Sequence, residues 1–359
     1  PYRRQRQMCI RDSYKVLPES QADYGRPTKM AARAYMAKVY LYQSKWKECL
    51  EACDEVIQSG KYELFPDFRN VFLPENDNCS EIIFAIQLSI NDGSPNNENG
   101  SYGDRLLPPG GPYPVYGFLR PTQNLVNAYK TDVKGLPYND GKDVSENDYV
   151  DVRLDHTLAR PNIPFMDVQL YDWTPREASV YGPYSPKKRL VSLNSTYYSP
   201  IWPYVNALNF YVIRYADLLL WRAEAAIETG DLETGRKYIN MIRERAKNTQ
   251  HVKTMDQSQD AANYKVGVYD EPFKSKNEAV QALRMERRLE MAHEGIRFFD
   301  LVRWGVADEV INAYIAKEKV FRSHLQNAHF VKGKHEYFPI PQSMIDICGT
   351  EVMKQNPGY

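Results

Sequence analysis

The sequence lacks an excess of charge of either sign. Lys plus Arg and Asp plus Glu each number 46 among 359 residues, so the formal net charge at pH 7 is zero. A neutral protein has no long-range field to attract a nucleic-acid backbone or an anionic lipid surface, and we therefore expect neither partner. No apolar run reaches the roughly 18 residues that a membrane-spanning helix needs.

Cysteine is scarce as well, at five residues, and an odd, sparse set does not indicate a disulfide framework. Cys49 and Cys53 are four apart in a helical pattern, but no second pair completes a zinc tetrahedron. The motifs GxGxxG, GxxxxGK[ST], HExxH and GxSxG are absent. We therefore expect no metal and no cofactor.

Apolar residues at helical spacing predict a helical hairpin after Pro27. One stripe runs from Met30 to Leu41, and a second begins at Trp46 and ends before Gly60. The pattern recurs at an offset of 186 positions, from Ala37 to Ala223, with Asp231 as the expected cap of the later second helix. Repeated hairpins of this kind are typical of tetratricopeptide-like units, which stack to bury their faces.

Further elements follow from local signals. Ser275 and Glu278 form a capping-box pattern that predicts a helix running to about His293, before Gly295. The apolar segment 82–88 predicts a short strand. Residues 89–114 contain five glycines and five prolines, which predicts a loop. The fold class is therefore mostly α, a helical superhelix interrupted by a long irregular region.

Aromatic residues are concentrated in that region. Segment 160–204 holds seven prolines and nine aromatic residues, so these rings are carried on irregular backbone. Rings of this kind either anchor their own loop or, where exposed, stack on the C–H face of a sugar or hold a peptide. As ligand-binding residues we predict, in order of preference, Trp173, Tyr171, Tyr181, Trp202, Tyr102 and Tyr113.

One carboxylate series raises a catalytic alternative. Glu286, Glu290 and Glu294 recur every four residues along one helix face, and two carboxyl groups across a cleft would suit a glycoside hydrolase. We favour a structural interpretation, in which these acids pair with Arg287, Arg288 and Arg297. His293 is interpreted as a packing residue because it points away from Glu294 and has no nucleophile near it.

Several stretches, in order, resemble the SusD/RagB nutrient-binding lipoproteins. They are RPTKMAARA at 26–34 with SGKYEL at 59–64, SEIIFAI at 80–86, DVRLD at 151–155, YVIRYADLLL at 211–220, ERRLE at 286–290, RFFDLVRWG at 297–305 and FPIP at 338–341. The final residues QNPGY are also similar to the end of that family.

The resemblance implies a non-catalytic, surface-exposed protein of the outer membrane. Such a protein captures glycan, or in some members peptide, and delivers it to a TonB-dependent SusC-like transporter. We expect one SusD-like domain over 14–359, divided into a hairpin and strand (27–88), an irregular ligand-binding region (89–210) and a helical scaffold (211–359). Residues 1–13 are expected to be a tail, without the family's lipid-anchor cysteine, and the neutral surface suggests a neutral glycan.

The matching motifs carry charges that we expect to form structural ion pairs among apolar neighbours. These charged residues are Arg153, Asp155, Arg214, Asp217, Arg297, Asp300 and Arg303.

Overall fold

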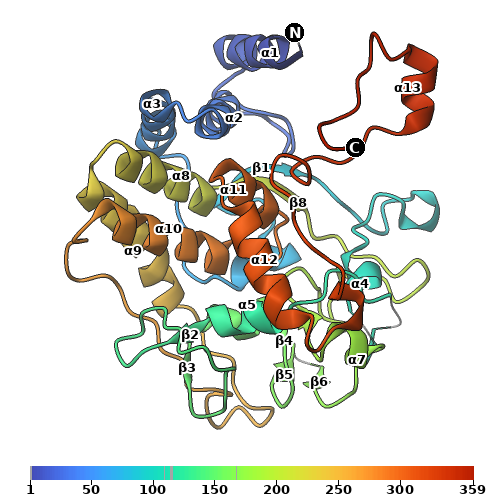
Figure 1. The fold of residues 1–359 in the computed structure, drawn as a ribbon. Helices are drawn as coiled ribbons and strands as arrows, with labels where there is room; N and C mark the ends of the chain where they lie inside the picture. Colours follow the sequence, from blue (N-terminus) through green and yellow to red (C-terminus); the bar gives the residue numbers. More distant parts are fainter. Residues whose placement is uncertain (1, 109, 114–115, 167) are drawn as a thin grey trace. The chain divides into compact units, whose positions relative to one another are not determined.

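The structure, a computed structural model, describes residues 2–108, 110–113, 116–166 and 168–359 (Figure 1). Two units are distinguished, the first Pro1–Ala178 with Gly182–His293 and the second Ser179–Tyr181 with Glu294–Tyr359. The first unit contains α1 (Tyr2–Val16), α2 (Lys29–Tyr42), α3 (Trp46–Gln58), β1 (Ile82–Ile86), α4 (Gly103–Leu106), α5 (Gln123–Ala128), β2 (Lys130–Thr131), β3 (Tyr149–Val150), α6 (Arg153–Thr157), β4 (Leu158–Ala159), β5 (Pro164–Phe165), β6 (Gln169–Leu170), β7 (Ser185–Pro186), β8 (Phe210–Arg214), α8 (Tyr215–Glu228), α9 (Leu232–Lys247) and α10 (Lys276–Glu290).

Two helical hairpins form the scaffold, as the sequence predicts. Helices α2 and α8 are offset by 186 positions at both ends, and α3 and α9 begin at the same offset. Small side chains at matched positions, Ala37 and Ala223, are fully buried, so the helices approach closely. Helix α3 packs against α8, and α10 packs against both α8 and α9. The mostly helical, tetratricopeptide-like fold class is therefore confirmed.

Local capping explains where these helices begin. The side chain of Asp231 accepts a hydrogen bond from the Thr234 amide at 3.0 Å, and Ser275 accepts one from the Glu278 amide at 3.2 Å. Both predicted caps are confirmed. Helix α10 ends at Glu290 instead of near His293, because His293 itself adopts a left-handed backbone with φ of 62°.

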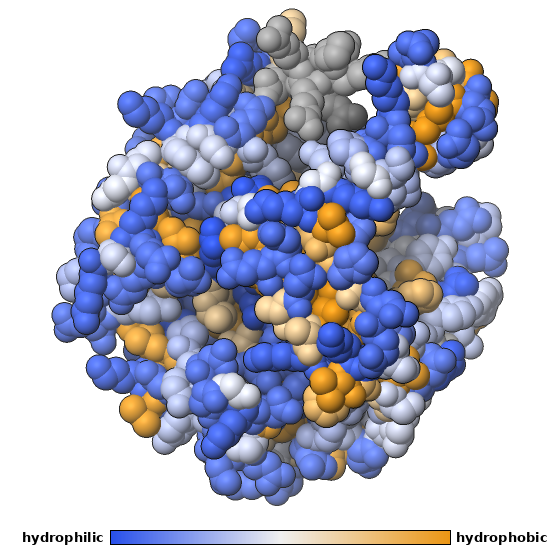
Figure 2. Space-filling view, viewed as in Figure 1, coloured by the Kyte–Doolittle hydropathy of each residue, from blue (hydrophilic) through white to orange (hydrophobic). Residues whose placement is uncertain are grey.

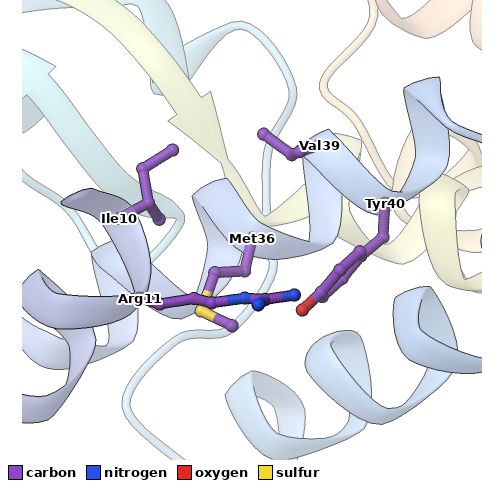
Figure 3. A pocket seen from close by; sticks show the side chains of 5 residues that line it. All are labelled: Ile10, Arg11, Met36, Val39 and Tyr40. Atoms are coloured by element: carbon purple, nitrogen blue, oxygen red, sulfur yellow. The ribbon is translucent and has the colours of Figure 1, made fainter. Parts of the chain in front are cut away.

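Residues 2–13 of the segment 1–13, which we expected to form a tail, are part of helix α1; residue 1 lies outside the described residues. Ile10 and Tyr14 are four residues apart and therefore lie on one helix face, and Tyr14 packs against the main hydrophobic core. Ile10 and Arg11 line a small cavity of about 10 Å³ with Met36, Val39 and Tyr40 of α2 (Figure 3). The predicted boundary at Ser13 divides this apolar face, because it places Ile10 in the tail and Tyr14 in the following domain.

The irregular region is organised by short antiparallel ladders. Strand β1 pairs with β8, which leads directly into α8, while β2 pairs with β3, β4 with β7 and β5 with β6. Strand β1 is shorter than the predicted 82–88, and the predicted loop 89–114 contains the single helical turn α4. Between these elements lie separate small apolar clusters, one of them dominated by aromatic rings.

The second unit contains α11 (Arg297–Arg303), α12 (Ala307–Glu318) and α13 (Gln342–Cys348). Helix α7 (Ala178–Tyr181) begins in the first unit, and its remaining residues belong to the second. Few apolar residues of this unit are buried, among them Leu301, Ala307 and Ile345.

The face in Figure 2 is mostly hydrophilic, with apolar residues in small separate patches. Among the described residues, no helix combines the length and the apolar character that crossing a bilayer requires.

Candidate ligand-binding site

The six predicted rings fall into two environments. Trp202, Tyr181 and Tyr102 are exposed, with 56%, 46% and 37% of their surface accessible. Tyr171 and Tyr113 are buried, and Trp173 is partly buried. A sugar can stack only on an accessible ring face, so burial decides which candidates remain.

Tyr113, Tyr171 and Trp173 come together in the interior around Phe165. The centroids of the Tyr171 and Trp173 rings are 4.2 Å apart, and that of Trp173 lies 5.2 Å from Phe165 in an edge-to-face arrangement. Both tyrosine hydroxyls donate to backbone carbonyls, Tyr113 to Val191 at 2.6 Å and Tyr171 to Pro183 at 2.7 Å. Tyr113 and Tyr171 are therefore core residues, which corrects their prediction as ligand-binding residues.

Trp173 is held by the same packing. Its ring rests on the backbone of Gly111, where a Cβ atom would lie only 2.3 Å from the ring. Its Nε1 is buried without a hydrogen-bond partner among the described residues. These rings of the long, proline-rich region pack mainly on one another, and so form a satellite apolar cluster of their own.

Three chain segments bring together the exposed rings of Tyr102, Tyr116 and Trp202. Residues 197–207 form a hairpin, in which the Ser199 amide bonds the Val205 carbonyl at 2.8 Å and Trp202 lies at the tip. The base of this hairpin pairs with Ser101, one residue before Tyr102. The third segment carries Tyr116, whose amide donates to the carbonyl of Arg105 in α4 at 3.2 Å.

Arg105 is the centre of this exposed cluster. Its guanidinium carbon lies 4.1 Å from the centroid of the Trp202 ring, 5.5 Å from that of Tyr116 and 5.7 Å from that of Tyr102. The Tyr204 ring adds an edge contact to Trp202, at 5.8 Å between centroids. We refer to Tyr102, Arg105, Tyr116 and Trp202 as the Arg105 cluster.

Asp104 fixes this cluster to the interior. Its buried carboxylate accepts hydrogen bonds from the Asn206 side chain at 2.5 Å and from the Val191 amide at 3.1 Å. These bonds join α4 to the Trp202 hairpin and to the chain that carries the buried rings. Burial raises the pKa of Asp104 to about 7, and the two hydrogen bonds oppose this effect.

Tyr181 belongs to the second unit, where its ring contacts His324 at 5.4 Å between centroids. Two members of the Arg105 cluster, Arg105 and Tyr116, are not among the residues predicted from the sequence. Tyr116 was detectable as one more ring in a glycine- and proline-rich stretch, whereas no pattern in the sequence indicated Arg105.

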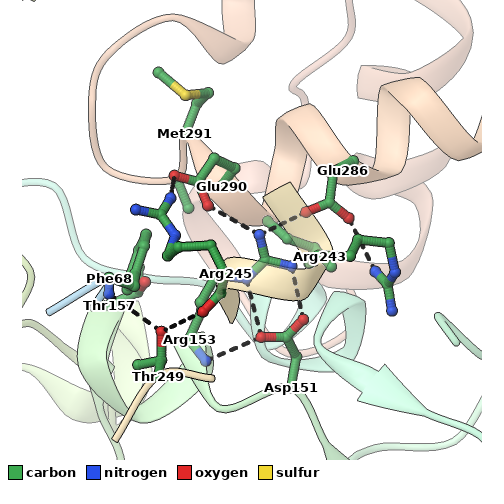
Figure 4. Close-up of polar contacts among 12 residues, drawn as sticks. Phe68, Asp151, Arg153, Thr157, Arg243, Arg245, Thr249, Glu286, Glu290 and Met291 are labelled. Atoms are coloured by element: carbon green, nitrogen blue, oxygen red, sulfur yellow. Dashed lines mark hydrogen bonds and ion pairs between the residues drawn. The ribbon is translucent and has the colours of Figure 1, made fainter. Parts of the chain in front are cut away.

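The predicted carboxylate pair lies elsewhere, in a buried ion network (Figure 4). Glu286 pairs with Arg153 at 2.6 Å and Arg243 at 2.9 Å, and Glu290 pairs with Arg153 at 2.9 Å and Arg214 at 2.7 Å. These carboxylates are almost completely buried, which makes them unsuited to hydrolysing a polysaccharide. Burial alone would raise the pKa of Glu290, but the surrounding arginines outweigh it and hold the pKa well below its ordinary value.

The prediction of structural ion pairs is confirmed, but the partners predicted for Glu286 and Glu290 were wrong. Glu286 and Glu290 pair with arginines of α6, β8 and α9 instead of their helix neighbours, because adjacent residues face different directions. Arg287 pairs with Asp217 of α8 at 2.8 Å, and Arg288 donates to the Asn124 carbonyl at 3.0 Å. Asp155 pairs with Arg160 at 2.7 Å, and Asp300 with Arg303 at 2.8 Å.

His293 is poorly suited to act as a base at neutral pH. Burial, followed by the nearby Lys188 ammonium, lowers the pKa of His293 to about 4. Glu294, the third carboxylate of the series, belongs to the second unit.

A second hollow of about 260 Å³ lies beside β1 and the chain before α2. Charged side chains on its wall already have ion-pair partners, since Glu19 contacts Lys61 at 2.6 Å and Lys29 at 3.1 Å. Asn78 on the same wall exchanges hydrogen bonds with Gln87. None of the six predicted rings lines this hollow.

Comparison with known proteins identifies the family. The SusD family model matches residues 80–359, most of the chain. The chain belongs to the SusD family. The predicted resemblance is thereby confirmed.

Individual SusD family relatives are distant. The chain is 25% identical to SusD-like protein P25 of Formosa agariphila, covering 92% of this chain and 58% of that protein. Among solved structures, a laminarin binding SusD-like protein superposes with a TM-score of 0.69 and surface glycan-binding protein A of Bacteroides fluxus with 0.68. Both are 22% identical, and each match covers 98% of this chain and 68% of the other. The chain thus spans just under three fifths of the length of the Formosa relative.

Proposed function

We propose that this chain captures glycan without cleaving it, at the Arg105 cluster. The observation that carries the proposal is that Tyr102, Tyr116 and Trp202 remain exposed around one guanidinium while other rings of the same region are buried. Membership of the SusD family supports a binding role, since two members with the same fold are named for binding laminarin or surface glycan.

The chemistry of the cluster suits a sugar. Arg105 covers one face of the Trp202 indole, and more than half of that side chain remains accessible for the C–H face of a pyranose. The tyrosine hydroxyls supply donors and acceptors for sugar hydroxyls. With roughly 1 kcal/mol from each stacked ring, we expect a dissociation constant in the micromolar range or weaker.

Capture without catalysis is supported by the position of the carboxylates. Glu286 and Glu290 form ion pairs with buried arginines, so the best candidate for a catalytic carboxylate pair in the sequence has a structural role. A peptide is the alternative ligand, because exposed rings also hold proline-rich or aromatic peptides.

The cellular setting belongs to the same proposal. We infer that the protein acts at the cell surface, held to the outer membrane by a lipid anchor. It would deliver its ligand to a TonB-dependent SusC-like transporter. Family membership supports this setting, and co-purification of the protein with such a transporter from detergent-solubilised outer membranes tests it.

Affinity gel electrophoresis tests glycan capture. The chain is run through gels containing laminarin, other β-glucans, α-glucans or uronate-containing polymers, and casein-derived peptides are tested by calorimetry. We expect retardation by at least one glycan and loss of it in Trp202→Ala. Tyr138→Ala removes a ring of similar exposure outside the cluster and should leave retardation unchanged.

Two results would contradict the proposal. Binding of peptides with no glycan retarded would favour the peptide alternative. Retardation that persists in Trp202→Ala but disappears in Tyr138→Ala would locate the site elsewhere on the chain.

A further inference from the structure

Within the described residues, aromatic rings hold Arg105 in place and none of its side-chain hydrogen-bond donors is used. Three rings surround its guanidinium, and its Nε is covered and has no hydrogen-bond partner among the described residues. The described part of the chain also supplies no carboxylate or carbonyl partner for its side chain, and Arg105 as a whole is only partly buried. A guanidinium carries five N–H donors, so the four on its terminal nitrogens are not used within the described residues.

Other arginines of the first unit contrast with this arrangement. Arg153 binds three carboxylates, and Arg160 binds Asp155 with two nitrogens. Arg69 donates to the carbonyls of Lys188 and Leu190. Partly buried cations normally acquire such partners because desolvation without compensation is costly. The unused donors of Arg105 therefore indicate a partner that comes from outside the chain.

The neighbouring acid does not fill this role. Asp104 precedes Arg105 directly, but its carboxylate points into the interior and bonds Asn206 and Val191. No described residue forms an ion pair with Arg105, so its positive charge is not neutralised by that part of the chain, although the whole sequence has no net charge. Apolar rings around the charge lower the local dielectric and strengthen its attraction for an anion.

We propose that the sugar unit bound at the Arg105 cluster is anionic, a pyranose that carries a carboxylate or a sulfate ester. This inference rests on the proposed glycan-binding function. The C–H face of one pyranose stacks on the accessible face of Trp202, and the acid group of the anionic unit next to it accepts hydrogen bonds from the terminal nitrogens of Arg105. The planar fork of an arginine suits two anionic oxygens, and the surrounding rings fix its orientation before the ligand arrives. The ligand is therefore an acidic polysaccharide, which differs from the neutral glycan that the overall charge suggests.

Calorimetry and affinity gels with the chain test this selectivity. The probes are polygalacturonate and alginate for carboxylates, a carrageenan for sulfate esters, and laminarin and dextran as neutral polymers. We expect an acidic polymer to bind at least tenfold more tightly than either neutral one, and to lose several-fold in affinity at 0.5 M NaCl. The comparison between uronates and carrageenan identifies the acid group.

Variants separate charge from stacking. Arg105→Gln should weaken binding of the acidic polymer about tenfold, and Arg105→Lys should restore part of that loss because it keeps charge without the fork. Arg176→Gln, at an exposed arginine outside the cluster, is the matched control and should bind like the parent chain. Circular dichroism checks folding, and the salt dependence of the parent chain decides the matter should Arg105→Gln unfold.

The outcomes distinguish this inference from the proposed function. Equal binding of neutral and acidic polymers, insensitive to salt and to Arg105→Gln, overturns the anionic ligand while glycan capture stands. Failure of every glycan to bind overturns both.

Discussion

The guanidinium of Arg105 covers the indole of Trp202 at 4.1 Å, although α4 and the Trp202 hairpin are far apart in the sequence. The contact exists because the hairpin pairs at its base with Ser101, just before α4, and because Asn206 binds Asp104. A small set of backbone and side-chain bonds thus joins a cation and three rings on one surface. The exposed residues of the Arg105 cluster are thus distinct from the buried rings around Phe165, which support the fold.

Trp173 and Trp202 should respond differently to removal of the ring. Trp173→Ala leaves a cavity between Phe165, Tyr171 and Gly111, and we expect it to lower the free energy of unfolding by about 3 kcal/mol. Trp202→Ala removes an exposed ring and should cost less than about 1 kcal/mol. Urea denaturation followed by circular dichroism measures both. Equal losses in the two variants would mean that Trp202 also supports the fold.

Gly111→Ala should destabilise the chain more than Gly141→Ala. Both glycines have left-handed backbones, with φ of 74° and 77°, so each substitution costs about 1 kcal/mol from backbone strain. Only at Gly111 does the new Cβ meet the Trp173 ring, whereas Gly141 has nothing within 4 Å. We expect an additional loss of about 1–3 kcal/mol at Gly111, measured by thermal and urea unfolding. Indistinguishable variants would show that Trp173 moves aside without cost.

Glu290→Gln should be strongly destabilising. Its carboxylate contacts Arg153, Arg214 and Arg245, and its removal leaves buried positive charge uncompensated. We expect a loss of about 3–5 kcal/mol in the free energy of unfolding. Glu51→Gln, the same change at an exposed position of α3, should have an effect below about 0.5 kcal/mol. A stable Glu290→Gln variant that unfolds at the same urea concentration as the parent would refute a structural role for the network.

Asp104 should make the chain less stable as the pH rises from about 4 to about 7. In that window the buried acid, whose pKa burial raises to about 7, is protonated in the folded chain but ionised in the unfolded chain. Unfolding therefore releases a proton, and its free energy falls with rising pH until the folded acid also ionises. The difference between the parent chain and Asp104→Asn isolates this slope, because other groups, such as His156 with its pKa lowered to about 4 by burial, titrate in both.

Urea denaturation of the two chains at intervals between pH 4 and pH 8 measures that difference. Parallel stability curves over the whole range would mean that Asp104 does not titrate as its burial implies.

The repeat of hairpins could be predicted because its signal is local. Matched small and apolar residues, from Ala37 to Val56 and from Ala223 to Ile242, specify both helices of each hairpin. Asp231 specifies the start of α9, and Ser275 specifies the start of α10. Helix α1 was missed because its first residues, rich in arginine and glutamine, give no apolar stripe, and because its apolar residues Ile10 and Tyr14 lie on either side of the predicted boundary at Ser13. The family motifs could be recognised for the same reason as the hairpins, because each motif is a run of contiguous residues.

The sequence by itself determined that this chain is a neutral, helical-repeat member of the SusD family with aromatic residues on proline-rich segments. It could not determine which rings are exposed, because burial depends on contacts such as Tyr171 with Trp173 and Tyr113 with Val191. Nor could it identify Arg105, whose surroundings come from three separate segments. Only the tertiary structure decides these points, since ring accessibility and charge compensation depend on distances between residues that no local spacing encodes.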